Sequence, residues 1–253
     1  MKSRKILSIF LGAVLVGGCS ELAGAKLLLP EEFGLTKIEN NLYIEDGAGE
    51  EAKANLRAAM RDAESAIKLT YGSVTSKPVV NVCVSEDCYR SFGGMGSKAK
   101  IYGSYILLSP RGNDWHFLAH EWSHDELRQR LSVAAWYRLP QWFDEGVAVA
   151  VSEAPEHSDG HWEFLEKSNI PRPTREQLLT YRTLRDWLNA VEEYSETQNA
   201  DRKARGEPEI RPVYTAAGHE VRAWLRAERT AGLLSLIGEL NEGEEFENVY
   251  FKK

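Results

Sequence analysis

Two kinds of hydrophobic pattern divide the chain into a strand-bearing half and a helical half. Alternating or β-branched apolar residues predict strands over residues 35–46, 78–84 and 105–108. Between the first two, apolar positions at helical spacing over residues 50–71 predict a long amphipathic helix, and Gly72 suits its C-terminal cap. The first half therefore reads as a small mixed set of strands with one helix.

From residue 113 onward the pattern is helical. Apolar periodicity predicts helices over residues 113–131, 140–151, 176–191, 213–228 and 230–240. The glycine-rich stretch 92–103 predicts a turn between strands, and the very polar stretch 192–211 predicts an exposed loop or mobile insertion without chemistry. The patterns together predict an α+β fold, with a small mixed strand-bearing N-terminal half packed on a helical half.

Composition limits the function classes. A chain of 253 residues, 43% of them apolar and 27% charged, can bury a sizeable core and is not disordered. The formal net charge is −7 and there is no general basic excess, so nucleic acid is not expected as a partner.

The N-terminus has the layout of a secretory signal. Positive residues within 2–5 precede an apolar run over residues 6–16, which is too short to span a bilayer comfortably, and Gly17 and Gly18 follow. This predicts a signal peptide over residues 1–18, a tether over 19–34 and a single catalytic domain over 35–253.

Residues Val16-Gly17-Gly18-Cys19 resemble a bacterial lipobox. That resemblance implies acylation of Cys19, an anchor that attaches the chain to a membrane. Ser20 after the cysteine favours the outer membrane, so the expected location is the bacterial cell envelope, with the domain facing the periplasm. An ordinary secretory signal with a stray cysteine is the alternative. Cleavage before Cys19 would change the net charge from −7 to −10.

Two further cysteines, Cys83 and Cys88, remain after cleavage. In an oxidising periplasm they could close a small disulfide loop, and two separate thiols are the alternative.

The strongest chemical signal is His120-Glu121-Trp122-Ser123-His124, an H-E-x-x-H motif within a predicted helix. Residues four apart lie one turn apart on one helix face, so His120 and His124 can hold one Zn²⁺. Glu121 can then lie beside a zinc-bound water as general base. Two solvent-facing histidines would be the plain structural alternative, but the neighbouring residues are mostly apolar.

A catalytic zinc site needs a third protein ligand, and a glutamate on a following helix can supply it. Downstream, residues 139–148 read LPQWFDEGVA. HEWSH followed by this segment resembles the gluzincin metallopeptidases, the clan of thermolysin and aminopeptidase N, and is most similar to a small bacterial branch with a P-x-W-x-x-E-G-x-A motif. The resemblance implies that Glu145 is the third ligand of a single Zn²⁺. His116 and Asp144 are the alternatives: His116 is a further turn away along the helix, and Asp144 reads as a helper or helix-start residue.

The same resemblance implies two other features. The clan has a Tyr or His on a later helix that stabilises the oxyanion, which here is Tyr214, with His219 as second candidate. Residues 103–108 fall where the clan has an edge strand antiparallel to the bound peptide. The glutamate of the aminopeptidase exopeptidase strand is missing from this stretch, which disfavours an aminopeptidase.

The sequence thus predicts a lipid-anchored periplasmic zinc peptidase that acts on a peptide or protein substrate. Two alternatives stay open: a non-catalytic zinc-binding lipoprotein that serves as a binding or assembly module, and a zinc amidase acting on cell-wall material. The sequence identifies no other substrate-binding residue.

Overall fold

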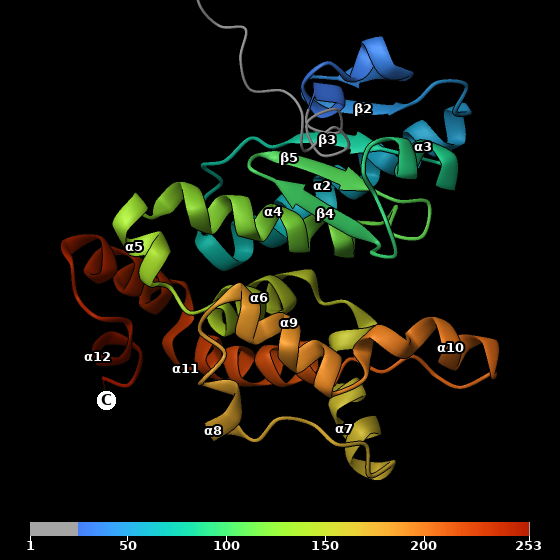
Figure 1. Cartoon of the computed structure of the whole chain (residues 1–253). Coiled ribbons are helices and arrows are strands. Elements are labelled where there is room, and N and C mark those ends of the chain that lie inside the picture. Colours follow the sequence, from blue (N-terminus) through green and yellow to red (C-terminus); the bar gives the residue numbers. More distant parts are fainter. Residues whose placement is uncertain (1–24, 253) are drawn as a thin grey trace, which may run out of the picture.

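The computed structural model describes residues 25–252 and has a five-stranded mixed sheet at one end (Figure 1). The strand order is β1-β2-β3-β5-β4; β2, β3 and β5 run parallel, and each outer strand pairs antiparallel with its neighbour. A 3₁₀ turn, η1 (Pro30–Phe33), precedes the sheet. The strands are β1 (Leu35–Glu39), β2 (Leu42–Glu45), β3 (Val79–Val82), β4 (Ala99–Tyr102) and β5 (Tyr105–Leu108).

The two faces of the sheet bury different cores, because successive side chains of a strand point to opposite sides. One face contributes Val80, Val82 and Ile106 to the main core. The other face contributes Cys83 and Leu107 to a smaller cluster. Helix α2 (Glu50–Tyr71) forms the crossover between the parallel strands β2 and β3 and buries its apolar face in the main core, as its spacing predicts.

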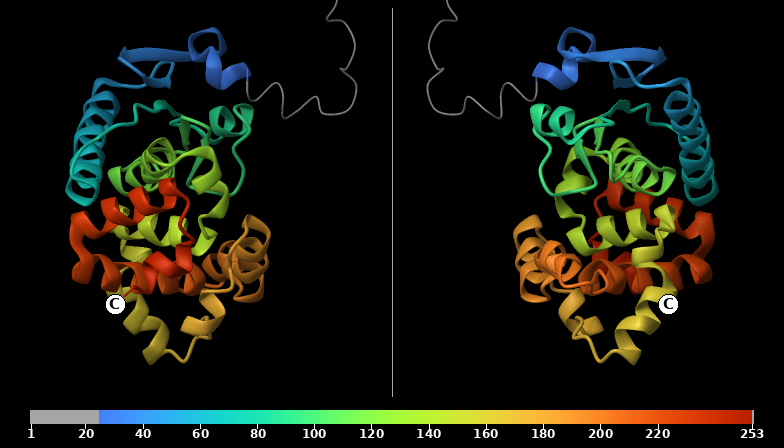
Figure 2. Two further views of the ribbon diagram at one scale, coloured as in Figure 1. Left: turned by 90° about the vertical axis from the view of Figure 1, so that its left-hand side faces the viewer. Right: turned by 90° about the vertical axis from the view of Figure 1, so that its right-hand side faces the viewer.

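The helical half lies beneath the sheet. Helix α4 (Trp115–Arg130) contacts β4, α2 and α6, and α6 in turn packs on the long α11 (Figures 1 and 2). The α+β prediction is therefore confirmed. The other helices are α3 (Glu86–Ser91), α5 (Val133–Arg138), α6 (Gln141–Ser152), α7 (Asp159–Lys167), α8 (Arg175–Leu178), α9 (Leu184–Glu193), α10 (Asn199–Ala204), α11 (Pro212–Glu242) and α12 (Phe246–Tyr250), with 3₁₀ turns η2 (Pro155–His157) and η3 (Glu196–Gln198).

The prediction of the edge strand was wrong. The expected edge, 103–108, contains β5, which lies between β3 and β4. The true edge strand is β4, within the stretch that the glycine pattern assigned to a turn. Gly103 has φ +62°, in the left-handed region, and the tight turn at Gly103-Ser104 folds β4 back along the outer side of β5.

The polar stretch 192–211 is also more ordered than predicted. It contains η3 and α10, and it buries Glu196 and Ile210. Asn199 fixes the return of the chain: its side-chain amide donates to the carbonyl of Ile210 (2.7 Å) and accepts from the Ile210 N–H (2.9 Å).

The predicted helices differ most from the observed ones at two places. The helix expected over 176–191 is split into α8 and α9, because Thr183 caps the start of a new helix. The two helices expected over 213–228 and 230–240 are the two arms of α11, which meet at a kink where Arg229 has non-helical φ and ψ angles.

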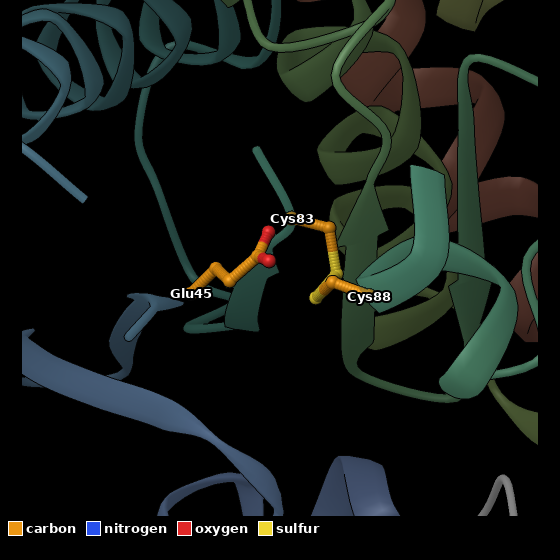
Figure 3. Close-up of side chains that lie close together, drawn as sticks. All are labelled: Glu45, Cys83 and Cys88. Carbon is orange, nitrogen blue, oxygen red and sulfur yellow. A yellow bond between two sulfur atoms is a disulfide. The ribbon is translucent and has the colours of Figure 1, made fainter. Parts of the chain in front are cut away.

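A disulfide joins Cys83, which follows β3, to Cys88 in α3, with their Cα atoms 5.5 Å apart (Figure 3). The carboxylate of Glu45 lies beside them. Its Oε2 accepts hydrogen bonds from the N–H groups of Val84 (2.8 Å) and Ser85 (2.7 Å), and its Oε1 accepts one from the Ser85 hydroxyl (2.6 Å). Because both cysteines are in the disulfide as well, this group has no spare ligands for a metal. Cys19 and the signal sequence lie outside the described residues. Over residues 25–252, no helix is both long and apolar enough to cross a bilayer.

Candidate metal centre

Three side chains converge between α4 and α6. The Nε2 atoms of His120 and His124 lie 3.3 Å apart, and Oε2 of Glu145 lies 3.4 Å from the first and 3.7 Å from the second. The side chains are only 10–12% exposed. The helical i, i+4 spacing brings the two imidazoles together, and the start of α6 brings the carboxylate against them.

These distances fit a tetrahedral metal ion. Zinc bonds of about 2.0–2.1 Å separate neighbouring ligand atoms by roughly 3.3–3.4 Å at tetrahedral angles. Oε2 of Glu145 is buried and has no hydrogen-bond partner among the described residues. Two imidazole nitrogens and a carboxylate oxygen that face one another form a donor set that suits a divalent metal ion.

Neighbours on α6 hold the ligands in place. Oδ2 of Asp144 lies 3.0 Å from Nδ1 of His124, an arrangement that directs Nε2 of the ring toward the centre. Gln141 donates from Nε2 to Oε1 of Glu145 (3.1 Å), which leaves Oε2 for the metal. The structure thus gives Asp144 the place of a helper, whereas the three-residue ligand group contains Glu145.

Gly146 sets the position of α6. A Cβ added at Gly146 would lie 2.5 Å from Val221 and 2.8 Å from the carbonyl oxygen of Ala217, both on α11. Only glycine therefore lets α6 approach α11 this closely, and this contact places the adjacent Glu145 at the histidines.

Glu121 is not one of the three converging residues but lines the adjoining cleft. This cleft has a volume of about 600 Å³ and is also lined by His124, Glu145 and residues 100–103 of the β4 edge and turn. Burial raises the pKa of Glu121, while the neighbouring imidazoles of His120 and His124 act in the opposite direction. A carboxylate at this place can exchange a proton with a molecule in the cleft.

Tyr214 lies near His120, and both line a second, smaller cavity together with His157. Its ring centroid is 6.2 Å from that of His120 and 5.3 Å from that of His157, on which it stacks, and Trp187 packs edge-on against it at 5.0 Å. Burial raises the pKa of Tyr214 strongly, so its hydroxyl stays protonated and can donate a hydrogen bond.

The other two candidate histidines lie elsewhere. Nδ1 of His116 lies 2.6 Å from the carbonyl oxygen of Ser152 and is therefore already hydrogen-bonded. His219 stacks on Trp162, with ring centroids 4.2 Å apart, and borders a separate groove beyond α8. Neither joins the group formed by His120, His124 and Glu145.

Sequence reasoning missed two residues near the centre. Gln141 precedes Glu145 by four positions on one helix, so its contact with the ligand was readable from spacing. His157 carried no such signal. It lies in the 3₁₀ turn η2, and only the packing of η2 against α11 brings it 6.4 Å from the His120 ring.

Comparison with models of known protein families gives no match, and comparison with curated proteins gives none either. The described residues contain a buried His120–His124–Glu145 group that is compatible with a metal ion.

Proposed function

We propose that the chain is a zinc-dependent peptidase. The observation that carries the proposal is the convergence of three metal-ligand atoms within 3.3–3.7 Å at the edge of a cleft that Glu121 lines. Zinc bound there would polarise a substrate carbonyl and lower the pKa of a water molecule. Glu121 would accept the proton of the attacking water and deliver it to the leaving amine.

Tyr214 supplies the second catalytic function. Its protonated hydroxyl, on a ring that lies near His120, would donate to the negative charge that develops on the carbonyl oxygen. Trp187 and His157 pack against its ring and hold it in place, so little reorganisation is needed during the reaction.

The edge strand β4 offers a template for an extended peptide. The N–H of Ser109 donates to the carbonyl of Lys98 (2.9 Å), which makes these two residues a hydrogen-bonded pair between the chain segments of β4 and β5. In an antiparallel ladder, such pairs recur at every second residue along β4. The backbone groups of Ile101 then point away from β5, toward the cleft side. A substrate strand can pair with them, which supports a polypeptide substrate.

The decisive experiment compares the parent with Glu121→Gln and Tyr214→Phe on a peptide library read by mass spectrometry. Both variants should keep one zinc per chain. Loss of the base should slow cleavage by about 10²–10⁴, and loss of the oxyanion donor by about 10²–10³. Glu163→Gln, at an exposed glutamate on α7, is the matched control and should cleave like the parent.

The remaining outcomes separate the rivals. Cleavage that persists in Glu121→Gln would show that another mechanism or a contaminant is responsible. A zinc-loaded parent that cleaves no peptide but releases amide-linked fragments from cell-wall material would indicate the amidase. A parent inactive on both, with a cellular phenotype that Glu121→Gln leaves unchanged, would indicate a non-catalytic binding or assembly module.

We also propose that Cys19 anchors the chain in the cell envelope, with the domain facing the periplasm. The lipobox-like segment supports this. Cys19→Ala should move the protein from the membrane fraction to the soluble fraction and abolish incorporation of labelled lipid. If the parent carries no lipid label and fractionates like the variant, the anchor proposal is wrong.

A further inference from the structure

Glu196 is a buried carboxyl group that meets the start of α11. It lies in η3 and is only 2% exposed, and its Oε1 accepts hydrogen bonds from the backbone N–H groups of Val213 and Tyr214. Tyr214 is the residue that we propose as oxyanion donor, and its backbone nitrogen lies 3.4 Å from Oε1 of Glu196. The polar stretch 192–211 thus reaches the candidate catalytic site through one side chain.

A local cap would satisfy the same backbone groups at a lower cost. Helices usually begin with Ser, Thr, Asp or Asn, whose side chain accepts hydrogen bonds from the N–H groups of the first turn. Here Arg211 stands at that position without such a hydrogen bond, and Pro212 has no N–H. A carboxyl group from another element takes over this role, although its burial costs free energy. Unlike a local cap, this contact also fixes the first turn of α11 relative to η3.

The chain around Glu196 is shaped for this contact. Ser195 has φ +63°, in the left-handed region that residues other than glycine rarely adopt. Backbone conformations of this kind cluster at functional sites. Further along the stretch, Asn199 hydrogen-bonds both backbone groups of Ile210, immediately before Arg211. These contacts hold η3 beside the start of α11.

The same turn of α11 is held from two other sides. The ring of Tyr214 stacks on His157, with centroids 5.3 Å apart, and Trp187 packs edge-on against it at 5.0 Å. These contacts hold the ring, whereas Glu196 binds the backbone from which the ring projects. Because a displacement of about 1 Å at a catalytic group can cost about 10²-fold in rate, this backbone contact matters for the chemistry as well as for stability.

We propose that Glu196 is a positioning residue: its carboxyl group anchors the backbone of Tyr214 and thereby sets where the tyrosine hydroxyl meets the substrate. The stretch 192–211 then supports the catalytic site from behind and is not a passive insertion. This inference rests on the proposed peptidase function and on the role of Tyr214 in it, and it adds a residue that acts without contacting the substrate.

The test compares Glu196→Leu, which replaces the acceptor by an apolar group of similar size, with Glu196→Gln, which keeps an acceptor. On the best peptide of the library, kcat should fall about 10²-fold in Glu196→Leu with KM nearly unchanged, and stay within about threefold of the parent's in Glu196→Gln. Both variants should hold one zinc per chain. Combined with Tyr214→Phe, Glu196→Leu should add almost no further loss, because no hydroxyl is left to position.

Asn241→Leu is the matched control. The Asn241 side chain also binds backbone groups, at the other end of α11: it accepts from the N–H of Ser132 (2.7 Å) and donates to the carbonyl of Arg130 (2.9 Å). Its replacement should lower the free energy of unfolding but leave kcat unchanged. If the parent cleaves peptides and Glu196→Leu has the kcat of this control, or if the losses multiply in the double variant, the inference is overturned while the peptidase stands.

A second measurement needs no activity. Protein labelled with fluorotyrosine gives a fluorine NMR signal for Tyr214, which is assigned by its absence in Tyr214→Phe. This signal should shift or broaden in Glu196→Leu and stay in place in Glu196→Gln and Asn241→Leu. If the parent cleaves nothing, the peptidase proposal fails and the NMR signal alone decides: an unchanged signal in Glu196→Leu overturns the inference.

A shorter carboxyl group keeps the test valid if Glu196→Leu does not fold. Glu196→Asp retains the acidic group but withdraws it by one methylene from the start of α11. A lower kcat and a shifted Tyr214 signal in this variant would support the inference. Parental values of both would overturn it.

Discussion

At the scale of residues, the centre is defined by atoms that lack other partners. A buried carboxylate oxygen without a hydrogen bond costs free energy. Here that oxygen, Oε2 of Glu145, lies within 3.4–3.7 Å of two imidazole nitrogens. A divalent cation would satisfy all three groups at once, which makes the assignment of ligands testable one side chain at a time.

We therefore expect His120→Ala, His124→Ala and Glu145→Ala each to lose most of the zinc, measured by metal analysis after gel filtration. Asp144→Asn should keep the site but weaken zinc binding by about 10–100-fold, because Asp144 orients His124 without being a ligand. His116→Ala, whose ring contacts the Ser152 carbonyl, should retain one zinc per chain. Full zinc occupancy in Glu145→Ala would contradict the third-ligand assignment.

The residues that sequence could identify are those linked by helical spacing. His120, Glu121 and His124 share one helix, and their motif alone indicates the chemistry. The prediction of Glu145 as a ligand depended on the resemblance, because nothing in the sequence of its own helix indicates that it contacts α4. His157 was beyond reach, because it is brought near His120 only by the packing of η2.

At the scale of elements, long periodic segments were predictable and short or marginal ones were not. The predicted bounds of helix α2, 50–71, are those of the structure, because 22 residues carry one continuous apolar stripe and end at a glycine. Strand β4 was missed, because four residues between glycines carry too little pattern to outweigh the turn signal. The polar composition of the stretch 192–211 predicts a loop, because composition does not reveal that one of its carboxylates is buried.

That carboxylate, Glu196, accepts hydrogen bonds from the backbone N–H groups of Val213 and Tyr214 at the start of α11. Burial raises its pKa from 4.5 to about 8. Between these two pH values the folded chain holds a proton that the unfolded chain has released. The stability contributed by this proton is complete below about pH 4.5 and is lost as the pH rises through 8.

Glu196→Gln cannot ionise, so its free energy of unfolding should rise relative to the parent's as the pH increases from 5 to 8. The steepest expected slope is about 1.4 kcal/mol per pH unit. Urea unfolding at pH 5, 6.5 and 8 measures this difference. The exposed-site control Glu163→Gln should show none, and a parallel pair of curves for Glu196→Gln and the parent would contradict the buried-proton account.

At the scale of the whole molecule, the candidate ligands join two packed helices that have different neighbours. Helix α4 packs against the sheet edge and α2, whereas α6 packs on α11. The two histidines belong to α4 and the glutamate to α6. A metal ion at this place would link α4, which packs on the sheet and α2, to α6, which packs on α11.

Zinc should therefore stabilise the entire domain rather than one loop. A ligand that binds only the folded state adds about 4 kcal/mol when its free concentration is 1,000 times its Kd. For a domain of this size, each kcal/mol corresponds to roughly 2–4 °C in Tm, so the zinc-loaded domain should melt about 8–16 °C above the chelator-treated one. Calorimetry in buffered zinc and in chelator measures the shift. His116→Ala should shift like the parent and Glu145→Ala should not, because only the latter removes the link between α6 and α4. An equal shift in Glu145→Ala would mean that zinc acts elsewhere on the chain.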